Sequence, residues 1–533
     1  MSNGLQVQST PIWKRVISFF FWVIVIVLVL GIIASALQVI DVWSQQQNSA
    51  NLIEARQADY AGTATAIAPD GDARHDVFQL VQFATNTPQV EEVSPPTATE
   101  QAPVPTTAPS QNQPIALPTF YFIPDAEIAE IAGTAVPPKA PLVPRNHQLI
   151  NVVLLGSDGD IVDDSTTRTD TIIIVSINVD TGTVAMLTIP RDTFVYIPTP
   201  SLQRINTVYG IGEAIGWTGG GFGLLRETIF YNFGIQVHYH AFVDISDLVE
   251  IIDTVGGVDI AVDCAYQDPP FFDADVPEEA IGPDEENVYI LPVGYYNFTG
   301  REAMWYARSR GNSDAFDRGR RHIQLLEAIF RAARDQGQIS QIPSLWSDLT
   351  EIVETDVPLE LVIQLLPIGL ELDSSRIERF IPIRTYHTTP WTPSVGDYAG
   401  QNVQVLNRDA IFELMNGFYT PPPESRLSLA GATVAVYNGT DIENLDIVAS
   451  ERLRNAGFNA IALGASDTQG LVNTTLTDLI AQSRGSATSL IASELNIVSD
   501  NITTSPDPNR EYDYVVTVGE TYDSFWESQL LDR

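Results

Sequence analysis

The sequence predicts an α/β protein whose central sheet carries helices on both faces, and three observations lead to this fold class. Short apolar runs rich in Val and Ile end at turn-forming residues, as buried strands do. Helical patterns alternate with these runs, which is typical of a sheet covered on both sides. A Thr-Gly-Arg-Glu capping box at 299–302 marks the start of a further helix. Strands are predicted at 149–155, 171–177, 184–189, 237–243, 258–262 and 377–383, and helices at 223–233, 246–255, 318–334, 358–366 and 407–416.

A membrane anchor is predicted near the N-terminus. Residues 16–40 contain no charged side chain and are long enough to cross a bilayer with some tilt. Lys14 and Arg15 directly precede this run, so the positive-inside rule places residues 1–15 in the cytoplasm. The small residues at 34–36 also fit a signal-peptide cleavage site, which is the alternative interpretation. Both interpretations export the remainder of the chain, and we expect a single-pass protein of the cell membrane with extracytoplasmic domains.

The exported part divides by composition into a stalk and two folded units. Pro, Thr, Ala, Gln and Glu dominate the segment after the anchor, and this composition predicts a disordered stalk because it buries little apolar surface. Strand patterns at 433–437 and 514–518 and a helical pattern at 447–456 predict a smaller C-terminal α/β domain. The predicted segments are a cytoplasmic tail (1–15), transmembrane helix (16–40), stalk (41–147), catalytic domain (148–340), helical extension (341–420), linker (421–429), C-terminal domain (430–523) and tail (524–533).

Charge and cysteine content exclude several classes of function. The formal net charge is -39, with 28 basic and 67 acidic residues, and such a chain repels nucleic acid. Cys264 is the only cysteine, which rules out an intramolecular disulfide and a cysteine-based zinc cluster. Eight arginines nevertheless fall between Arg301 and Arg334. A basic island in an acidic protein indicates a local anion site, although a solvated basic helix face is the alternative.

Two carboxylates stand where predicted strands meet loops. Asp158 follows the first strand, and Asp170 opens the second. Ligand sites in open α/β sheets form at strand ends, so neighbouring strands would bring these carboxylates together. Carboxylate oxygens suit a hard cation such as Mg²⁺, which leaves coordination positions for phosphate oxygens and water. Two aspartates at strand ends are also common as caps or in solvated turns.

Arginines gather at the same predicted sheet edge. Arg191 follows the third strand, behind a proline that stops the ladder. Arg308 and Arg310 are two residues apart, so they share a ligand only if the backbone there is a turn or extended. Two adjacent phosphates carry more charge than one arginine compensates, and a pyrophosphate therefore needs several convergent guanidiniums. The candidate arginines are Arg191, Arg204, Arg308, Arg310, Arg318, Arg320 and Arg321.

These short motifs occur in the order of a known family. The chain from about 151 to 335 resembles the LytR-CpsA-Psr domain, and the tail from about 430 to 523 resembles the LytR C-terminal domain. Two positions depart from the family pattern: His322 stands where glutamine is usual, and Arg204 replaces a lysine. The motifs are Gly156-Ser157-Asp158, Arg168-Thr169-Asp170-Thr171, Ile189-Pro190-Arg191-Asp192, Arg204-Ile205-Asn206, Val255-Gly256-Gly257-Val258, and Tyr306-Ala307-Arg308-Ser309-Arg310 through Asp317-Arg318-Gly319-Arg320-Arg321.

The resemblance implies a mixed central sheet and a specific activity. Family members move a glycopolymer from a polyprenyl-pyrophosphate lipid to cell-wall peptidoglycan, with the lipid tail in a hydrophobic groove. The implied partners are therefore that lipid-linked glycopolymer, peptidoglycan and membrane lipid. By matching positions, Asp158 and Asp170 would hold Mg²⁺ or Mn²⁺. The implied pyrophosphate-binding residues are Arg191, Arg204, Arg308, Arg310 and Arg318, and those with a catalytic role are Asp170, Arg191 and Arg310.

The attacking group in such a transfer is a poorly acidic sugar hydroxyl, which needs a base. Asp170, Asp192 and Asp244 are the candidates. Two other functions stay open. One is hydrolysis of a polyprenyl pyrophosphate at the same site, with water as acceptor. The other is a non-catalytic wall-binding or regulatory anchor, against which the aspartate and arginine set argues.

Overall fold

The computed structural model describes residues 130–131, 134–135, 137–157, 167–199, 201–271, 274–337, 339–341, 346, 350, 353–394, 398–480 and 487–522. The predicted membrane helix at 16–40, nearly all of the stalk and Asp158 lie outside these residues. Among the helices that are described, none combines the length and apolar character needed to span a bilayer.

The main domain is built on a six-stranded mixed sheet in the order β13-β8-β3-β4-β5-β14. Antiparallel pairing joins β3 to β4, β4 to β5 and β13 to β8, whereas β8 is parallel to β3 and β14 is parallel to β5. The mixed α/β sheet is therefore confirmed. The strands are β3 (Leu149–Ser157), β4 (Thr171–Asn178), β5 (Thr183–Thr188), β8 (Tyr239–Asp244), β13 (Glu354–Thr355) and β14 (Ile377–Phe380).

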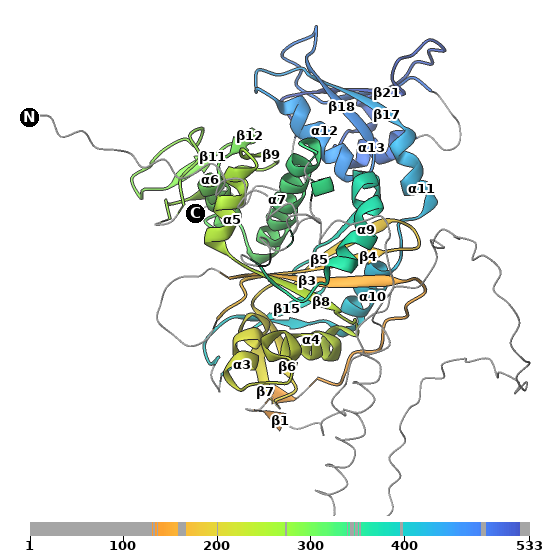
Figure 1. The fold of residues 1–533 in the computed structure, drawn as a ribbon. Helices are drawn as coiled ribbons and strands as arrows, with labels where there is room; N and C mark the ends of the chain where they lie inside the picture. The colour runs from red at the N-terminus through yellow and green to blue at the C-terminus, as the bar shows by residue number, and fades with distance from the viewer. Residues whose placement is uncertain are drawn as a thin grey trace, which may run out of the picture. The chain divides into compact units, whose positions relative to one another are not determined.

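Helices cover both faces of this sheet, because its strands are apolar on both sides. Along β3, Ile150, Val152 and Leu154 enter one core, and Val153 and Leu155 enter the other. Figure 1 shows α7 and α9 on one side of the sheet and α3 and α4 on the other. The first face packs against α5 (Ile245–Thr254), α6 (Gly300–Arg308), α7 (Ala315–Asp335) and α9 (Leu359–Glu371), and the second against α3 (Val208–Ala214), α4 (Gly220–Phe233) and α10 (Arg408–Tyr419).

A second, four-stranded sheet was not predicted. Its order is β15-β16-β6-β7, and it joins segments about two hundred residues apart in sequence. The region expected as a helical extension therefore also supplies strands, to this sheet and, through β13 and β14, to the central one. Strands of four or five residues carry too little periodic signal to be found alone. They are β6 (Thr193–Ile197), β7 (Ser201–Arg204), β15 (Thr388–Trp391) and β16 (Val403–Leu406).

Further short strands complete the main domain. Two antiparallel strand pairs lie between α5 and α6 in the sequence, and one pair is nested inside the other. They are formed by β9 (Val258–Val262) with β12 (Gly294–Phe298) and by β10 (Tyr266–Asp268) with β11 (Tyr289–Leu291). A small hairpin pairs β1 (Glu130–Ile131) with β2 (Thr134–Ala135), and a short helix, α11 (Glu424–Leu427), follows α10.

The C-terminal domain has its own five-stranded mixed sheet, ordered β18-β17-β21-β19-β20. Helix α12 packs on it and also contacts β9 and β12 of the main domain. Arg331 on α7 forms an ion pair with Glu451 on α12, and Glu451 also binds Arg454. The elements are β17 (Thr433–Asn438), α12 (Leu445–Asn455), β18 (Asn459–Ala465), β19 (Thr475–Asp478), α13 (Thr488–Glu494), β20 (Ile502–Thr504) and β21 (Tyr514–Val518).

Candidate functional site

An apolar cavity of about 90 Å³ lies between the central sheet and helices α6 and α7. Its polar lining residues come from α6, α7 and the strand ends on one side of the sheet, where the register places Gly156 opposite Thr171 and Ser157 opposite Asp244. We call this polar end the mouth; it consists of Ser157, Asp170, Asp244, Arg308 and Arg318. The apolar wall includes Leu154, Ile173, Val243, Leu248, Met304, Ala307, Leu325, Leu326 and Ile329.

Asp170 is the best-connected carboxylate of the mouth. Its side chain accepts hydrogen bonds from Arg191 and from Asn206 Nδ2, the latter at 2.9 Å. Its main-chain oxygen accepts a hydrogen bond from Arg318 Nη2 at 3.2 Å. Burial alone would raise the pKa of Asp170, but the Arg191 charge, the Asn206 hydrogen bond and the Arg318 charge together hold that pKa below its usual value. The carboxyl group is therefore an anion near neutral pH.

Arg308 and Arg318 reach the mouth because of how their helices end and begin. Helix α6 starts at the predicted Thr299–Glu302 capping box and ends at Arg308, whose guanidinium lies 5.3 Å from the centre of the Phe271 ring. Helix α7 begins at Ala315, because the Asp314 side chain accepts the first free backbone N–H groups. This start lies three residues before the predicted one and places Arg318 in the first turn.

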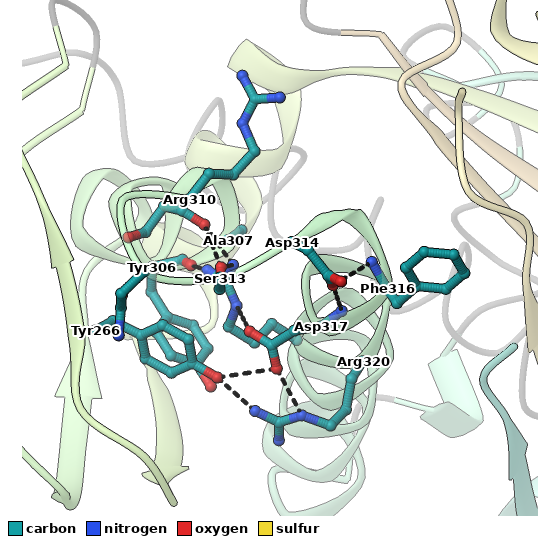
Figure 2. A network of polar contacts seen from close by, with 12 residues as sticks. Tyr266, Tyr306, Ala307, Arg310, Ser313, Asp314, Phe316, Asp317 and Arg320 are labelled. Atoms are coloured by element: carbon teal, nitrogen blue, oxygen red, sulfur yellow. Dashed lines mark hydrogen bonds and ion pairs between the residues drawn. The ribbon is translucent and has the colours of Figure 1, made fainter. Parts of the chain in front are cut away.

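Arg310 and Arg204 lie elsewhere. The Arg310 side chain is exposed and extends away from the polar network around it, as Figure 2 shows. Its backbone N–H is bound by Asp268. Arg204 reaches the site only through Asp192: Arg204 Nε lies 3.5 Å from Asp192 Oδ1, and Arg191 Nε lies 3.8 Å from Asp192 Oδ2.

Arg320 and Arg321 hold the fold together beneath the mouth. Arg320 binds Asp317, Asp263 and the Tyr266 hydroxyl. Arg321 is fully buried and binds Asp317, and it also donates to the carbonyl oxygens at the end of α6. Figure 2 shows Asp317 between Tyr266 and Arg320. The arginine island is therefore divided: Arg308 and Arg318 line the cavity, whereas Arg320 and Arg321 fix the connection between α6 and α7.

His322 also lines the cavity, although residue chemistry alone did not single it out. Its Nδ1 lies 3.1 Å from Thr171 Oγ1, and its Nε2 lies 3.2 Å from the Ala307 carbonyl oxygen. Burial and the Arg318 and Arg321 charges lower the pKa of His322 to about 3, so the ring is neutral. Nε2–H then donates to the carbonyl and Nδ1 accepts from the threonine. The only sequence feature that pointed to His322 was its place at a position where the family usually has glutamine.

The predicted metal ligands, Asp158 and Asp170, are carboxylates, which are the ligand type that a hard cation prefers. Asp170 presents carboxylate oxygen at the mouth, while Asp158 lies outside the described residues. The described part of the chain contains no group of three or more His, Cys, Asp or Glu side chains arranged for a metal ion. Of the candidate bases, Asp170 and Asp192 are engaged by arginines, and Asp244 is exposed at the mouth.

The fold is thus an α/β domain with an apolar cavity that is lined, at the ends of the central strands, by carboxylates and by two arginines of the covering helices. Comparison with known proteins assigns its family. The sequence model of the LytR_cpsA_psr family matches residues 127–414, more than half of the chain, and the chain belongs to this family. Residues 431–522 match the model described as LytR cell envelope-related transcriptional attenuator. The resemblance noted in the motifs is confirmed for both regions.

Individual relatives are distant. A polyisoprenyl-teichoic acid–peptidoglycan teichoic acid transferase, TagU, of Oceanobacillus iheyensis is 29% identical over 228 residues, which are 40% of this chain and 61% of the relative. The chain thus spans about three fifths of that transferase. The regulatory protein MsrR of Staphylococcus aureus is 24% identical over 277 residues, 51% of this chain and 76% of the relative. The crystal structure of TagV from B. subtilis superposes with a TM-score of 0.40 and 22% identity, covering 51% of this chain and 95% of that one.

Proposed function

We propose that this protein transfers a glycopolymer phosphate from a polyprenyl-pyrophosphate carrier to cell-wall peptidoglycan. One observation carries the proposal: an apolar cavity ends at a mouth that combines Arg308 and Arg318 with the carboxylate of Asp170. Such a site matches a molecule with an apolar chain on one side and phosphates on the other. The name of the Oceanobacillus relative, a polyisoprenyl-dependent teichoic acid transferase, supports the same substrate class.

The arginines would act by charge. In the transfer, the acceptor hydroxyl oxygen forms a bond to the phosphorus that carries the glycan, and the bond from that phosphorus to the bridging oxygen breaks. Polyprenyl phosphate leaves with the additional negative charge. Arg308 and Arg318 stand at the mouth, where they would stabilise this charge, and Arg191 orients Asp170 beside them.

Asp244 is our proposed base. It is the exposed carboxylate of the mouth and lies directly opposite Ser157 in the parallel register of β8 and β3. Asp170 is less suited, because its arginine and Asn206 partners hold its pKa below the usual value and make it a weaker proton acceptor. Asp192 is already engaged by Arg191 and Arg204. Asp244 would take the hydroxyl proton as the oxygen attacks.

Mg²⁺ or Mn²⁺ would be held by Asp170 together with Asp158. Bound there, the ion would neutralise charge on the phosphate oxygens. The carboxylate chemistry of Asp170 fits such an ion. Chelation followed by metal replacement tests this role, with Mg²⁺-dependent protection of the protein against thermal unfolding as the readout besides activity.

The location follows from the same proposal. Residues 16–40 would anchor the chain, with the catalytic and C-terminal domains outside the cell. Protease added to intact protoplasts should then remove both domains and leave the N-terminal tail protected. Degradation only after lysis would contradict this orientation.

A reconstituted reaction tests the function. The purified full chain is incubated with a polyprenyl-pyrophosphate sugar, Mg²⁺ and peptidoglycan fragments. Sugar phosphate covalently joined to the fragments supports transfer, whereas free sugar phosphate alone supports hydrolysis. Arg318→Ala should abolish turnover, while Arg301→Ala, which removes an exposed arginine of α6 paired with Asp275, should keep it. If the wild type shows no turnover, and Arg318→Ala binds the lipid as well as Arg301→Ala does, the transfer and hydrolysis functions are both excluded. The wall-binding or regulatory function would then be favoured.

A further inference from the structure

The outer face of the second sheet carries a cluster of aromatic side chains beside the mouth. The register places Thr389, Val405, Phe194 and Arg204 in one row across β15, β16, β6 and β7. The opposite face of β6 presents Val195 and Ile197 to the main core. On the face of the row, one end is covered, because Phe194 packs against the buried side chains of Tyr196 and Leu202. Val405 remains 36% exposed, and Phe194 is only half-buried.

Two further rings extend the row into a surface that we call the aromatic platform, made of Phe194, Trp391, Tyr398, Val405 and Arg204. The Phe194 ring lies 5.8 Å from Trp391 and 5.5 Å from Tyr398, measured between ring centres. The Arg204 guanidinium lies 5.4 Å from the centre of the Tyr398 ring. All three rings are partly exposed. Partly exposed aromatic side chains beside amide and arginine groups are apolar surfaces with polar handles.

The platform is continuous with the candidate site. Arg204 contacts Asp192, Asp192 contacts Arg191, and Arg191 binds Asp170 at the mouth. Polar groups lie at the rim of the platform, where the Tyr398 hydroxyl donates to Gln203 Oε1 at 2.8 Å and Arg204 Nη2 donates to the Asn402 carbonyl oxygen at 2.9 Å. A ligand on the platform would therefore meet the reacting phosphate at its Arg204 end.

We propose that the aromatic platform binds the uncharged glycan strand of the acceptor. The proposal rests on the proposed transfer and names the part of the molecule that holds the acceptor. A sugar ring has an apolar face of C–H groups that stacks on aromatic rings, while its hydroxyls use neighbouring amide and guanidinium groups. Charge favours the acceptor over a polyanionic donor chain. Arg204, the platform's cation, is already neutralised by Asp192, and the chain carries a net charge of -39.

Binding is tested without turnover, so the result is independent of whether transfer occurs. The full chain is titrated by calorimetry with chitotetraose, a neutral N-acetylhexosamine oligomer, and with a glycerol-phosphate oligomer as the polyanionic probe. We expect saturable binding of chitotetraose and at least tenfold weaker binding of the glycerol-phosphate oligomer. Trp391→Ala should weaken chitotetraose binding at least tenfold, and Trp391→Phe, which keeps a ring, should restore most of it.

Two further variants control the interpretation. Val405→Asp places a carboxylate in the centre of the row at an already exposed position, and it should weaken binding without unfolding the sheet. Tyr386→Ala removes another exposed ring, 54% exposed at the opposite end of β15 from Trp391, and should change binding less than twofold. In the transfer assay, Trp391→Ala should raise the KM for peptidoglycan fragments and leave kcat and the KM for lipid within twofold.

Three results would overturn the proposal. The first is an absence of chitotetraose binding to the wild type, which would leave the rings as a cover for the sheet. The second is unchanged binding by both Trp391→Ala and Val405→Asp. The third is a preference for the glycerol-phosphate oligomer, which would assign the platform to the donor. Failure of transfer together with intact, Trp391-dependent chitotetraose binding would instead contradict the proposed function alone.

Discussion

Replacing Arg321 by methionine should destabilise the main domain strongly, although this arginine belongs to the same basic island as Arg318. Arg321 is fully buried, binds Asp317, and donates to the Tyr306 and Ser309 carbonyl oxygens. Methionine fills a similar volume, so the substitution removes the charge and the donors without opening a large cavity. Breaking a buried ion pair by removing one partner costs about 3–5 kcal/mol.

This cost converts to a measurable shift. A domain of roughly this size loses about 2–4 °C in Tm for each kcal/mol, so Arg321→Met should lower the Tm by about 6–20 °C. Arg310→Met is the matched control, because its side chain is exposed, and should change stability by no more than about 0.5 kcal/mol. Differential scanning calorimetry measures both. Equal Tm values for the two variants would refute the structural role of Arg321.

The pH dependence gives an independent check. Burial alone would raise the pKa of Asp317, but Arg320 and Arg321 hold that pKa below its ordinary value of 3.8. The ionised group therefore stabilises the folded state fully above about pH 3.8, and this contribution is lost as the pH falls through the folded-state pKa. Arg321→Met removes one of the two charges that lower the pKa of Asp317, so burial raises that pKa relative to the wild type. Acid unfolding of the variant should therefore begin at a higher pH. Coincident acid-unfolding curves would contradict this reasoning.

Three further predictions concern the cavity, the mouth and the C-terminal domain. Leu248→Trp should fill part of the cavity and weaken binding of a fluorescent polyprenyl phosphate at least tenfold, whereas volume-conserving Leu248→Met should not; equal affinities would show that the lipid binds elsewhere. Arg318→Met should lower pyrophosphate affinity at least tenfold, measured by calorimetry on protein that circular dichroism shows to be folded, and an unchanged affinity would remove Arg318 from the site. Glu451→Gln should weaken the contact with Arg331 and speed tryptic release of the C-terminal domain at the 421–429 linker; an unchanged cleavage rate would mean that other contacts hold the domain.

Much of the fold could be predicted from patterns of neighbouring residues in the sequence. The strands at Val258–Val262 and Tyr514–Val518 were predicted at their observed bounds, and the capping box at Thr299 begins α6 as expected. These features depend on side-chain alternation or on a hydrogen bond within four residues, both of which are local in sequence. The start of α7 was displaced by three residues, because the Asp314 cap lies before the first apolar position of the predicted helix.

The second sheet shows where local pattern ends. Strand β6 pairs with β16 only when residues about two hundred positions apart in the sequence meet. Neither strand is long enough to be predicted from its own sequence pattern. The aromatic platform depends on that pairing, since it places Val405 directly beside Phe194. No reading of either segment alone predicts such a surface.

Residue types and motif order determined the kind of chemistry: carboxylates and arginines at one sheet edge, in the sequence of a known family. Tertiary structure decided which arginine does what. Arg318, Arg320 and Arg321 are near neighbours in sequence, yet only Arg318 of the three lines the cavity. Arg320 binds Asp317 and Asp263, and Arg321 donates to a carbonyl oxygen at the end of α6. A helix turns by about 100° per residue, so adjacent side chains meet different surroundings. Only the packing of α6, α7 and the sheet defines those surroundings.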